Sequence, residues 1–264
     1  MFKLILLIII LAFIFETLDS AAGMGFGTCM APILFLLGYN PLQIVPTLLI
    51  SEAITGLVDS FFDHEFGNVH FSFRPLNDTT KFTLLVAFFG CLAIFSSISL
   101  AYLTFNLSEI ILKIYVAILV LAMGFIGLIR LKIKILDKIR FKPKLFFAFS
   151  ALAGFNKGIG GGGYGPVITM GQIFSGVYEK SATAIVSLAE ALVSITGIFT
   201  FFLISLAGVE LDLVLLPSIF TGGFLAALLS PYLVRIMPNI IWKIIIPIYA
   251  IIMGIVSLLL ILIY

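Results

Sequence analysis

Charge is scarce in this sequence. Only 11% of its 264 residues are Asp, Glu, Lys or Arg, whereas a soluble domain has about 25%. Hydrophobic residues take 62% of the positions, and the mean hydropathy is +1.26. A water-soluble fold could not hide this much apolar surface, so the composition predicts an integral membrane protein with the lipid bilayer as its partner. The net charge of +2 comes from few and scattered residues and indicates no nucleic-acid partner.

Cysteine and histidine are also rare. Cys29 and Cys91 lie in apolar stretches without metal-ligand spacing, which argues against a disulfide framework and against a zinc site. His64 and His70 lie in a short polar stretch, where a solvated loop is a simpler interpretation than a metal site. The sequence contains no HExxH motif, no nucleophile elbow and no paired metal ligands. We therefore predict no enzyme activity, no metal and no cofactor.

Long apolar runs dominate the chain instead. A helix that spans a membrane needs about 20 mostly apolar residues. The sequence predicts an all-α membrane protein with apolar segments near 2–22, 24–38, 42–62, 81–104, 109–130, 143–158, 160–176, 180–207, 211–232 and 238–263. The segments 24–38 and 160–176 are short and interrupted by glycine and proline. We expect these two to enter the membrane without crossing it as straight helices, because broken backbone needs protein neighbours or a cavity.

Basic residues gather between the fifth and sixth segments. They are Arg130, Lys132, Lys134, Lys138, Arg140, Lys142 and Lys144, opposed by Asp137. The positive-inside rule places this stretch in the cytoplasm; binding to anionic lipid is the alternative. We expect a multi-pass protein of the cell (plasma) membrane with both termini outside. Only the positive charge of Lys3, near the N-terminus, disagrees with this orientation. Aromatic side chains near segment ends fit interfacial anchors, namely Tyr102, Tyr115, Trp242 and Tyr264.

The two halves of the chain share a pattern. Residues 27–32 (GTCMAP) align with 161–166 (GGGYGP), and 47–51 (TLLIS) align with 183–187 (TAIVS) after a two-residue insertion. Five apolar segments per half is an odd number, so the second copy should be inverted relative to the first. The predicted parts are a first repeat at 1–131, a basic cytoplasmic linker at 132–142 and a second repeat at 143–264. Short broken segments at equivalent places in inverted repeats are typical of a transporter's central binding site.

A run of glycines precedes Pro166 in the second half, and Lys157 comes just before it. Consecutive glycines let several backbone N–H groups face one point. A half-helix that starts near Pro166 would aim its positive end there, and Lys157 would add a full charge. This pattern favours an anion. Close helix packing through small residues is the structural alternative, but four adjacent glycines exceed what packing requires.

The first half carries a weaker version of this loop. Gly25 and Gly27 are kept, but Met24 and Phe26 stand where the other loop has glycine. Thr28 adds a hydroxyl group. The predicted site between the two loops is therefore asymmetric.

Polar residues also follow helix faces inside the apolar segments. Thr47, Ser51, Thr55 and Asp59 are spaced by four, and Thr183, Ser187, Glu190, Ser194 and Gly197 by four and three, so each set shares a face. A buried acid is costly, roughly 2.5–3.5 kcal/mol for Asp at a membrane helix centre, and is a functional candidate by default. We predict that Glu190 or Glu52 carries a proton coupled to anion movement, since burial can keep a carboxyl group protonated near neutral pH. Neutral side chains that only bond neighbouring helices are the alternative.

These patterns define two groups of candidate residues. The predicted anion ligands are Lys157, Gly160, Gly161, Gly162, Gly163, Gly25, Gly27, Thr28, Ser51, Thr55 and Ser187. The predicted proton-coupling residues are Glu190, Glu52 and Asp19. Because the two loops occupy equivalent places in the halves, we also expect Asp19 or Glu16 to form an ion pair with Lys157.

The stretch GGGGYGP at 160–166, with Gly-Asn-Val at 67–69, resembles the sulfite exporter TauE/SafE family, also called the 4-toluene sulfonate uptake permease family. The resemblance covers both halves and the basic stretch between them, while Met24 and Phe26 depart from the family's glycine-rich first loop. It implies a membrane permease for sulfur oxyanions or organosulfonates. Together with the residues, it predicts a secondary transporter of a small anion, with sulfite or an organosulfonate favoured and proton coupling expected. An anion channel is the alternative.

Overall fold

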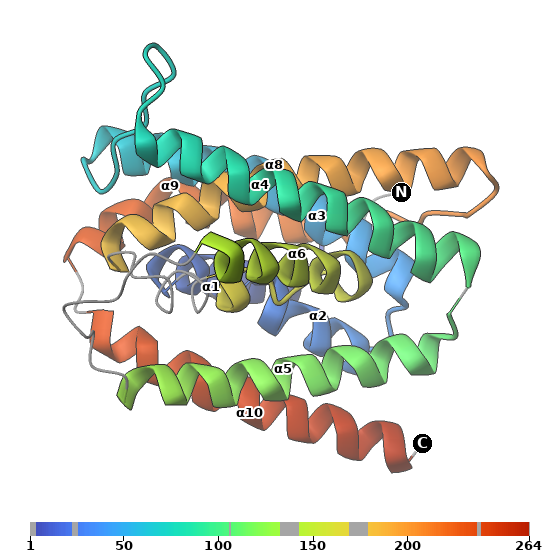
Figure 1. Cartoon of the computed structure of the whole chain (residues 1–264). Helices are drawn as coiled ribbons and strands as arrows, with labels where there is room; N and C mark the ends of the chain where they lie inside the picture. The colour runs from blue at the N-terminus through green and yellow to red at the C-terminus, as the bar shows by residue number, and fades with distance from the viewer. Residues whose placement is uncertain are drawn as a thin grey trace.

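A computed structural model of the chain describes residues 4–22, 26–105, 107–132, 143–168, 179–236 and 239–263. Helices make up nearly all of these ranges (Figure 1). They are α1 (Leu6–Ala22), α2 (Phe26–Leu36), α3 (Pro41–Glu65), α4 (Asp78–Ile98), the short π-helix η1 (Ser99–Thr104), α5 (Glu109–Lys132), α6 (Pro143–Gly160), α8 (Glu179–Leu206), α9 (Leu216–Ile236) and α10 (Asn239–Ile263). The predicted all-α class is confirmed, and the helix bounds follow the predicted apolar segments closely. Segment 160–176 lies within the described residues only as far as 168.

Asparagine side chains cap the N-termini of α3 and α4, the two helices that the 66–77 loop joins. At α3, the Asn40 side chain accepts a hydrogen bond from Gln43 N and Gln43 Oε1 accepts one from Asn40 N, both at 3.0 Å. This reciprocal pair is a capping box, and Pro41 at the first helical position suits the fixed proline φ angle. At α4, Asn77 Oδ1 accepts from Thr80 N at 2.8 Å. The sequence therefore defines the residue at which each of these two helices begins.

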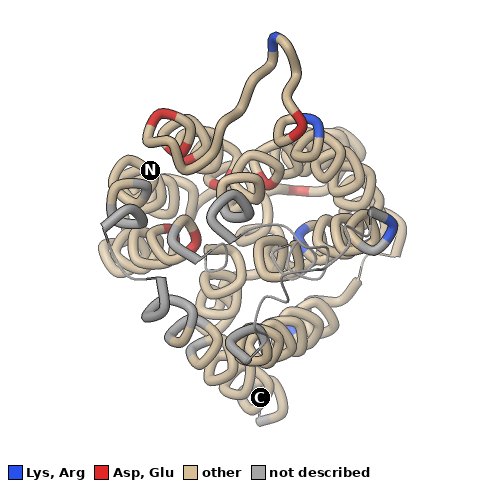
Figure 2. Tube along the Cα trace, turned by 60° about the vertical axis from the view of Figure 1, so that its left-hand side comes forward, with Lys and Arg blue, Asp and Glu red and all other residues tan. Residues whose placement is uncertain are grey.

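Several helices are long and apolar enough to cross a membrane. In the described residues these candidate spans are Pro41–Glu65, Asp78–Thr104, Ile110–Ile129 and Ala184–Leu206, and shorter apolar helices cover Phe26–Leu36, Leu216–Ser230 and Ala250–Leu259. Large apolar side chains such as Phe88, Leu92 and Phe125 are exposed on the outer faces. Figure 2 shows acidic positions inside the bundle, while the helices are otherwise largely free of charge. Such a distribution fits a multi-pass protein surrounded by lipid.

The helix contacts follow a symmetric scheme. The helices of the first half can be matched in order with those of the second: α1 with α6, α3 with α8, α4 with α9 and α5 with α10. Under this matching the α1–α9 contact corresponds to the α6–α4 contact, and the α3–α9 contact corresponds to the α8–α4 contact. The α3–α8 and α5–α10 contacts map onto themselves. This scheme is what two related halves would give. The opposite orientation of the halves in a bilayer, and the boundaries at 131 and 143, stay predictions.

Helices α1 and α2 form a hairpin whose two open ends lie at the same end of the bundle. The backbone N–H of Ile5 donates to Ser218 Oγ at 2.9 Å, at the start of α9. Just past α2, Gln43 Nε2 donates to Asp212 Oδ2 at 2.6 Å, in the same 207–218 connection. The start of α1 and the end of α2 therefore lie at that end, while the start of α2, at Phe26 and Gly27, is buried in the interior.

Candidate functional site

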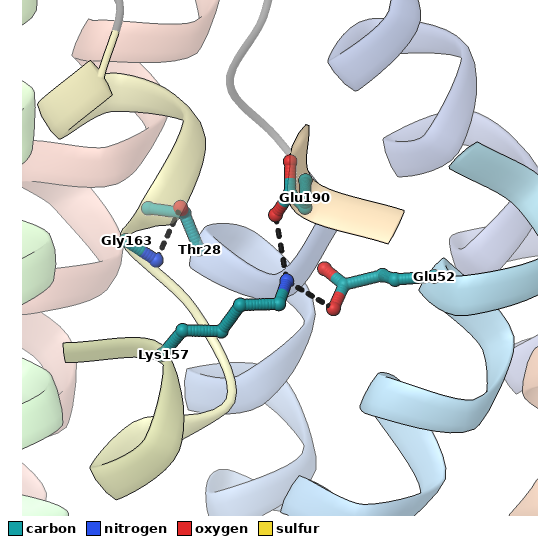
Figure 3. A network of polar contacts seen from close by, with 5 residues as sticks. All are labelled: Thr28, Glu52, Lys157, Gly163 and Glu190. Carbon is teal, nitrogen blue, oxygen red and sulfur yellow. Dashed lines mark hydrogen bonds and ion pairs between the residues drawn. The ribbon is translucent and has the colours of Figure 1, made fainter. Parts of the chain in front are cut away.

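The centre of the bundle holds a buried ion cluster around Lys157, near the end of α6. The Lys157 side chain is 0% exposed, and its Nζ donates to Glu52 Oε2 at 2.5 Å and to Glu190 Oε1 at 2.6 Å (Figure 3). Glu52 comes from α3 and Glu190 from α8. Burial of an unpaired charge is far more costly than burial of a hydrogen-bonded pair, so each carboxylate stabilises the lysine. With all three groups ionised, the cluster carries one negative charge.

The expected pairing of Lys157 with Asp19 or Glu16 is wrong. Its ion pairs are with Glu52 and Glu190. The reason lies in the packing: the end of α6 runs toward the α3–α8 contact at the centre of the molecule, whereas Glu16 and Asp19 lie on α1, which packs mainly against α9. The structure does bring together Lys157, which the sequence assigned to anion binding, and Glu52 and Glu190, which it assigned to proton coupling.

The two glycine stretches meet backbone to backbone. A Cβ atom on Gly27 would lie 2.2 Å from the carbonyl oxygen of Gly161, and one on Gly162 would lie 2.5 Å from the carbonyl carbon of Gly27. No real Cβ tolerates such distances, so both positions require glycine for close approach. Close packing, the structural alternative in the sequence, therefore explains Gly27 and Gly162 in this conformation.

The turn after α6 also depends on glycine. Gly161 and Gly163 have φ angles of +73° and +82°, in the left-handed region that other residues rarely adopt. The Gly161 N–H donates to the carbonyl of Lys157 at 2.8 Å, and the Gly163 N–H donates to Thr28 Oγ1 at 3.1 Å (Figure 3). Two of the amides expected to face an anion are thus occupied within the protein. Gly160 is also confined, because a Cβ there would lie 2.5 Å from Val116.

The hydroxyl candidates lie on the buried face of α3 and on α8. Ser51 and Thr55 are 0% exposed, and among the described residues neither hydroxyl has a hydrogen-bond partner. Ser187 lies beside Glu190 in the wall of a small cavity. Gly25, together with Met24, lies outside the described residues. The period of four placed the residues of the α3 stripe on one face, and in the structure all of them are buried.

The small cavity next to the ion cluster is lined mainly by acids. It measures about 10 Å³ and is lined by Glu16, Asp19, Glu52, Thr55, Gly56, Asp59, Ser187 and Glu190. A cavity of that size holds about one water molecule. The sequence pattern suggested Glu16 as a partner of Lys157 and placed Asp59 on the α3 stripe, but it assigned proton coupling to neither residue. Among the described residues, no group of three or more His, Cys, Asp or Glu is arranged to hold a metal ion.

Two tyrosines fix the end of α6. Tyr102 is 6% exposed and its OH donates to the Ile159 carbonyl at 2.7 Å. The Tyr115 OH donates to Asn156 Oδ1. The prediction that Tyr102 is an interfacial anchor is wrong, since its hydroxyl meets a buried backbone carbonyl and not the membrane surface. Tyr115 is partly buried and also points to α6, while nothing is described of the side chains of Trp242 and Tyr264.

A larger cavity opens at the end of the bundle where α3 starts. It measures about 410 Å³ and is lined by Asn40, Pro41, Leu42, Tyr102, Leu107, Leu112, Glu210, Leu211 and Asp212. Its volume lies within the range of small-molecule pockets, about 300–1,000 Å³. Because Tyr102 also bonds the α6 end, this cavity lies one side chain away from the glycine turn.

Comparisons with known proteins agree with this architecture. The model of a family described as "Sulfite exporter TauE/SafE" matches residues 8–258. The chain is 25% identical over 226 residues to "Probable membrane transporter protein YtnM" of Bacillus subtilis (strain 168), which is 83% of this chain and 71% of that protein. No solved structure gives a significant match. These matches confirm a membrane transporter and not an enzyme. The chain therefore belongs to the sulfite exporter TauE/SafE family of membrane transporters, as its glycine motif predicted.

Proposed function

We propose that this protein is a secondary transporter of a small anion, with sulfite or an organosulfonate as substrate and Lys157 as its central positive charge. The observation that carries the proposal is the position of Lys157. It is fully buried where α3 and α8, one helix from each predicted repeat, pack together, and it is held by two carboxylates. A buried lysine whose partners are themselves titratable is a charge that can be released for a ligand.

In this proposal the substrate exchanges with a carboxylate. Protonation of Glu52 or Glu190 removes the negative charge that holds Lys157, and the ammonium group then binds the incoming anion. Proton uptake and anion binding become coupled, because Lys157 cannot serve a carboxylate and the substrate equally well at the same time. Asp19 lines the same cavity as both glutamates, which supports its assignment as a third coupling residue.

Polar groups around Lys157 would complete the substrate's shell. We assign this role to Ser51, Thr55 and Ser187, to Thr28, and to the backbone amides of Gly160, Gly161, Gly162, Gly163, Gly25 and Gly27. The hydroxyls of Ser51 and Thr55 are buried without a partner in the described part of the chain, which supports their assignment. The amide of Gly163 is held by Thr28, so it would join only after the two glycine stretches separate. The amide of Gly161 is held by the carbonyl of Lys157, so it would join only if the last turn of α6 opens.

Alternating access accounts for the closed centre better than an open pore does. The two glycine stretches touch, and the cavity beside Lys157 measures about 10 Å³. The cavity of about 410 Å³ at the start of α3 provides an entrance from one end. Rocking of one half against the other would open the centre to each side in turn. This closed geometry favours a transporter over the anion channel, and single-channel currents across a planar bilayer would reverse that preference.

Uptake into proteoliposomes tests the proposal. We expect the wild-type protein to take up sulfite, Lys157→Gln to lose at least nine-tenths of that uptake, and Lys81→Gln to behave as the wild type. Lys81 is a suitable control because its side chain is exposed and pairs only with exposed Asp78 among described partners. Absence of uptake for sulfite, sulfate, thiosulfate and short sulfonates would contradict the substrate class. Full uptake by folded Lys157→Gln would contradict the central role of the lysine.

A further inference from the structure

A column of buried acids leads away from Lys157 toward one end of the protein. On α3, Glu52, Asp59 and Asp63 are spaced by seven and four residues and share a face, and each is at most 9% exposed. Glu16 of α1 lies with Glu52 and Asp59 in the wall of the central cavity. We name these four residues the acidic column. From residue 52 to residue 63 the helix rises about 16 Å, about half the thickness of a membrane's hydrocarbon core.

The inner part of the column contains polar atoms without partners. Among the described residues, Glu16 Oε2 and Thr55 Oγ1 are buried and make no hydrogen bond. Both residues line the cavity of about 10 Å³, together with Glu52 and Asp59. Unsatisfied buried polar atoms are rare in native proteins and call for a ligand or a water molecule. An acid-lined space for about one water molecule suits a proton carrier and does not suit an anion.

The middle of the column is a switchable hydrogen-bond network. Ser20 Oγ donates to Asp59 Oδ2 at 2.5 Å. Ser230 Oγ lies 3.0 Å from Ser20 Oγ and 3.2 Å from Asp59 Oδ1. A hydroxyl has one proton to donate, so Ser230 can serve only one of these two acceptors at a time. Two hydroxyls from α1 and α9 therefore meet the α3 carboxylate in an arrangement that can pass a proton by rotation of the O–H groups.

The outer end of the column reaches the loop after α3. Asn68 Nδ2 donates to Asp63 Oδ1 at 2.8 Å. Asn68 is half-buried, and its neighbours Gly67 and His70 are exposed. Asp63 is thus one side chain from solvent. The positive-inside interpretation of the sequence places this end in the cytoplasm.

The charges around the column are strongly unbalanced. The described charged groups that face it are Glu16 and Asp19 of α1, Glu52, Asp59 and Asp63 of α3, Lys157 of α6 and Glu190 of α8; α9 contributes the hydroxyl of Ser230. The column and the groups around it thus hold six carboxyl groups and one lysine among the described residues. Like charges at short range in a water-poor interior repel each other, so an added proton relieves this repulsion wherever it resides on the column.

We propose that the acidic column conducts protons between the loop end of α3 and the central Lys157 cluster. A proton enters at Asp63, passes through Asp59 with its serine hydroxyls and through Glu16 with the cavity water, and is accepted by Glu52. The neutral Glu52 releases Lys157, so one proton is taken up as one site for an anion becomes free. This inference rests on the proposed function for its anion, but the path itself is defined by residues outside the predicted substrate shell.

Sulfite exchange and proton movement measured in the same proteoliposomes test the column. We expect Asp59→Asn to keep at least half of the wild-type sulfite exchange at equal pH on both sides. The same variant should lose at least nine-tenths of the sulfite accumulation driven by a pH gradient and of the proton uptake reported by a trapped pH dye. Asp78→Asn, which makes the same change at an exposed position, should match the wild type in all three measurements. Wild-type proton coupling in folded Asp59→Asn would overturn the proposal.

Two further measurements keep the proposal testable if Asp59→Asn does not fold or if sulfite is not the substrate. Ser230→Ala removes a relay hydroxyl and changes no charge, so it should slow proton uptake several-fold and leave sulfite exchange unchanged. Dicyclohexylcarbodiimide labels protonated carboxyl groups in apolar surroundings and needs no substrate. We expect it to label Glu16 or Asp59 less as the pH rises. The proposed path would be overturned if no residue of the acidic column were labelled, or if Ser230→Ala took up protons as fast as the wild type. If the wild-type protein showed no sulfite exchange but the other results held, only the proposed substrate would be contradicted.

Discussion

Lys157 shares a single positive charge between two carboxylates. Its Nζ lies within 2.6 Å of an oxygen from each of Glu52 and Glu190. The same Nζ atom lies 5.7 Å from the centroid of the Tyr164 ring. The ring adds an attractive contact with a cation. The three charged groups are therefore mutually dependent, and loss of the lysine would leave two buried carboxylates facing each other.

Removal of the lysine charge should destabilise the fold. Breaking a buried ion pair by removing one partner costs about 3–5 kcal/mol, so we expect Lys157→Gln to lower the free energy of unfolding by about that amount. Adding Glu52→Gln and Glu190→Gln to Lys157→Gln should recover much of the loss, because no unpaired charge then remains in the cluster. Thermal unfolding of the detergent-purified proteins measures both effects. Equal stability of Lys157→Gln and the exposed-site control Lys81→Gln would show that the cluster is not held by charge.

Part of the candidate site could be predicted from residue spacing alone. The period of four placed Thr47, Ser51, Thr55 and Asp59 on one face, and all four are buried. The partner of Lys157 could not be predicted in the same way. It depends on how far α6 extends past α3 and α8, and this register is set by tertiary contacts that a single sequence does not encode as a local pattern.

At the scale of secondary-structure elements, the crossing of α2 with the turn after α6 is the contact that must separate for the proposed opening of the centre. The glycines on both sides of the crossing leave no space for a side chain, and Thr28 of α2 bonds the backbone of the turn. The sequence identified both glycine stretches and their equivalence. It did not reveal that they touch, because the same glycines serve equally well for a ligand cradle and for backbone contact.

A methyl group at this crossing should separate the two elements. In Gly162→Ala the new Cβ would lie 2.5 Å from backbone atoms of Gly27, and neither backbone can yield as a flexible side chain would. We expect a lower melting temperature and the loss of most sulfite uptake. Ser96→Ala, a small change at an exposed position on α4, is the control. A Gly162→Ala protein with wild-type stability and uptake would show that the crossing separates freely.

At the scale of the whole molecule, composition and apolar segments predicted the helices well, because each helix reads as one apolar run with polar or glycine-rich ends. The Asn40 and Asn77 caps mark two of the starts. The symmetric scheme of helix contacts supports the predicted repeat. Its inversion relative to the bilayer and the orientation of the chain stay predictions, which rest on the basic residues of the 132–142 linker.

The orientation yields a direct prediction. The start of α1 and the end of α10 lie toward the same end of the bundle (Figure 1), opposite the loop that follows α3. With the basic 132–142 linker inside, we expect a C-terminal fusion to a reporter that works only in the cytoplasm to be inactive. The matched fusion to a reporter that works only outside should be active. The reverse pattern would place both termini in the cytoplasm.

Binding of sulfite to purified protein tests the central claim most directly. If the anion replaces a carboxylate on Lys157, neutralising that carboxylate should free the lysine and strengthen binding. Titration calorimetry should show sulfite binding to the wild type, at least tenfold tighter binding to Glu190→Gln, which corresponds to about 1.4 kcal/mol, and no measurable binding to Lys157→Gln. Wild-type affinity in a folded Lys157→Gln protein, or weaker binding in Glu190→Gln, would contradict the account.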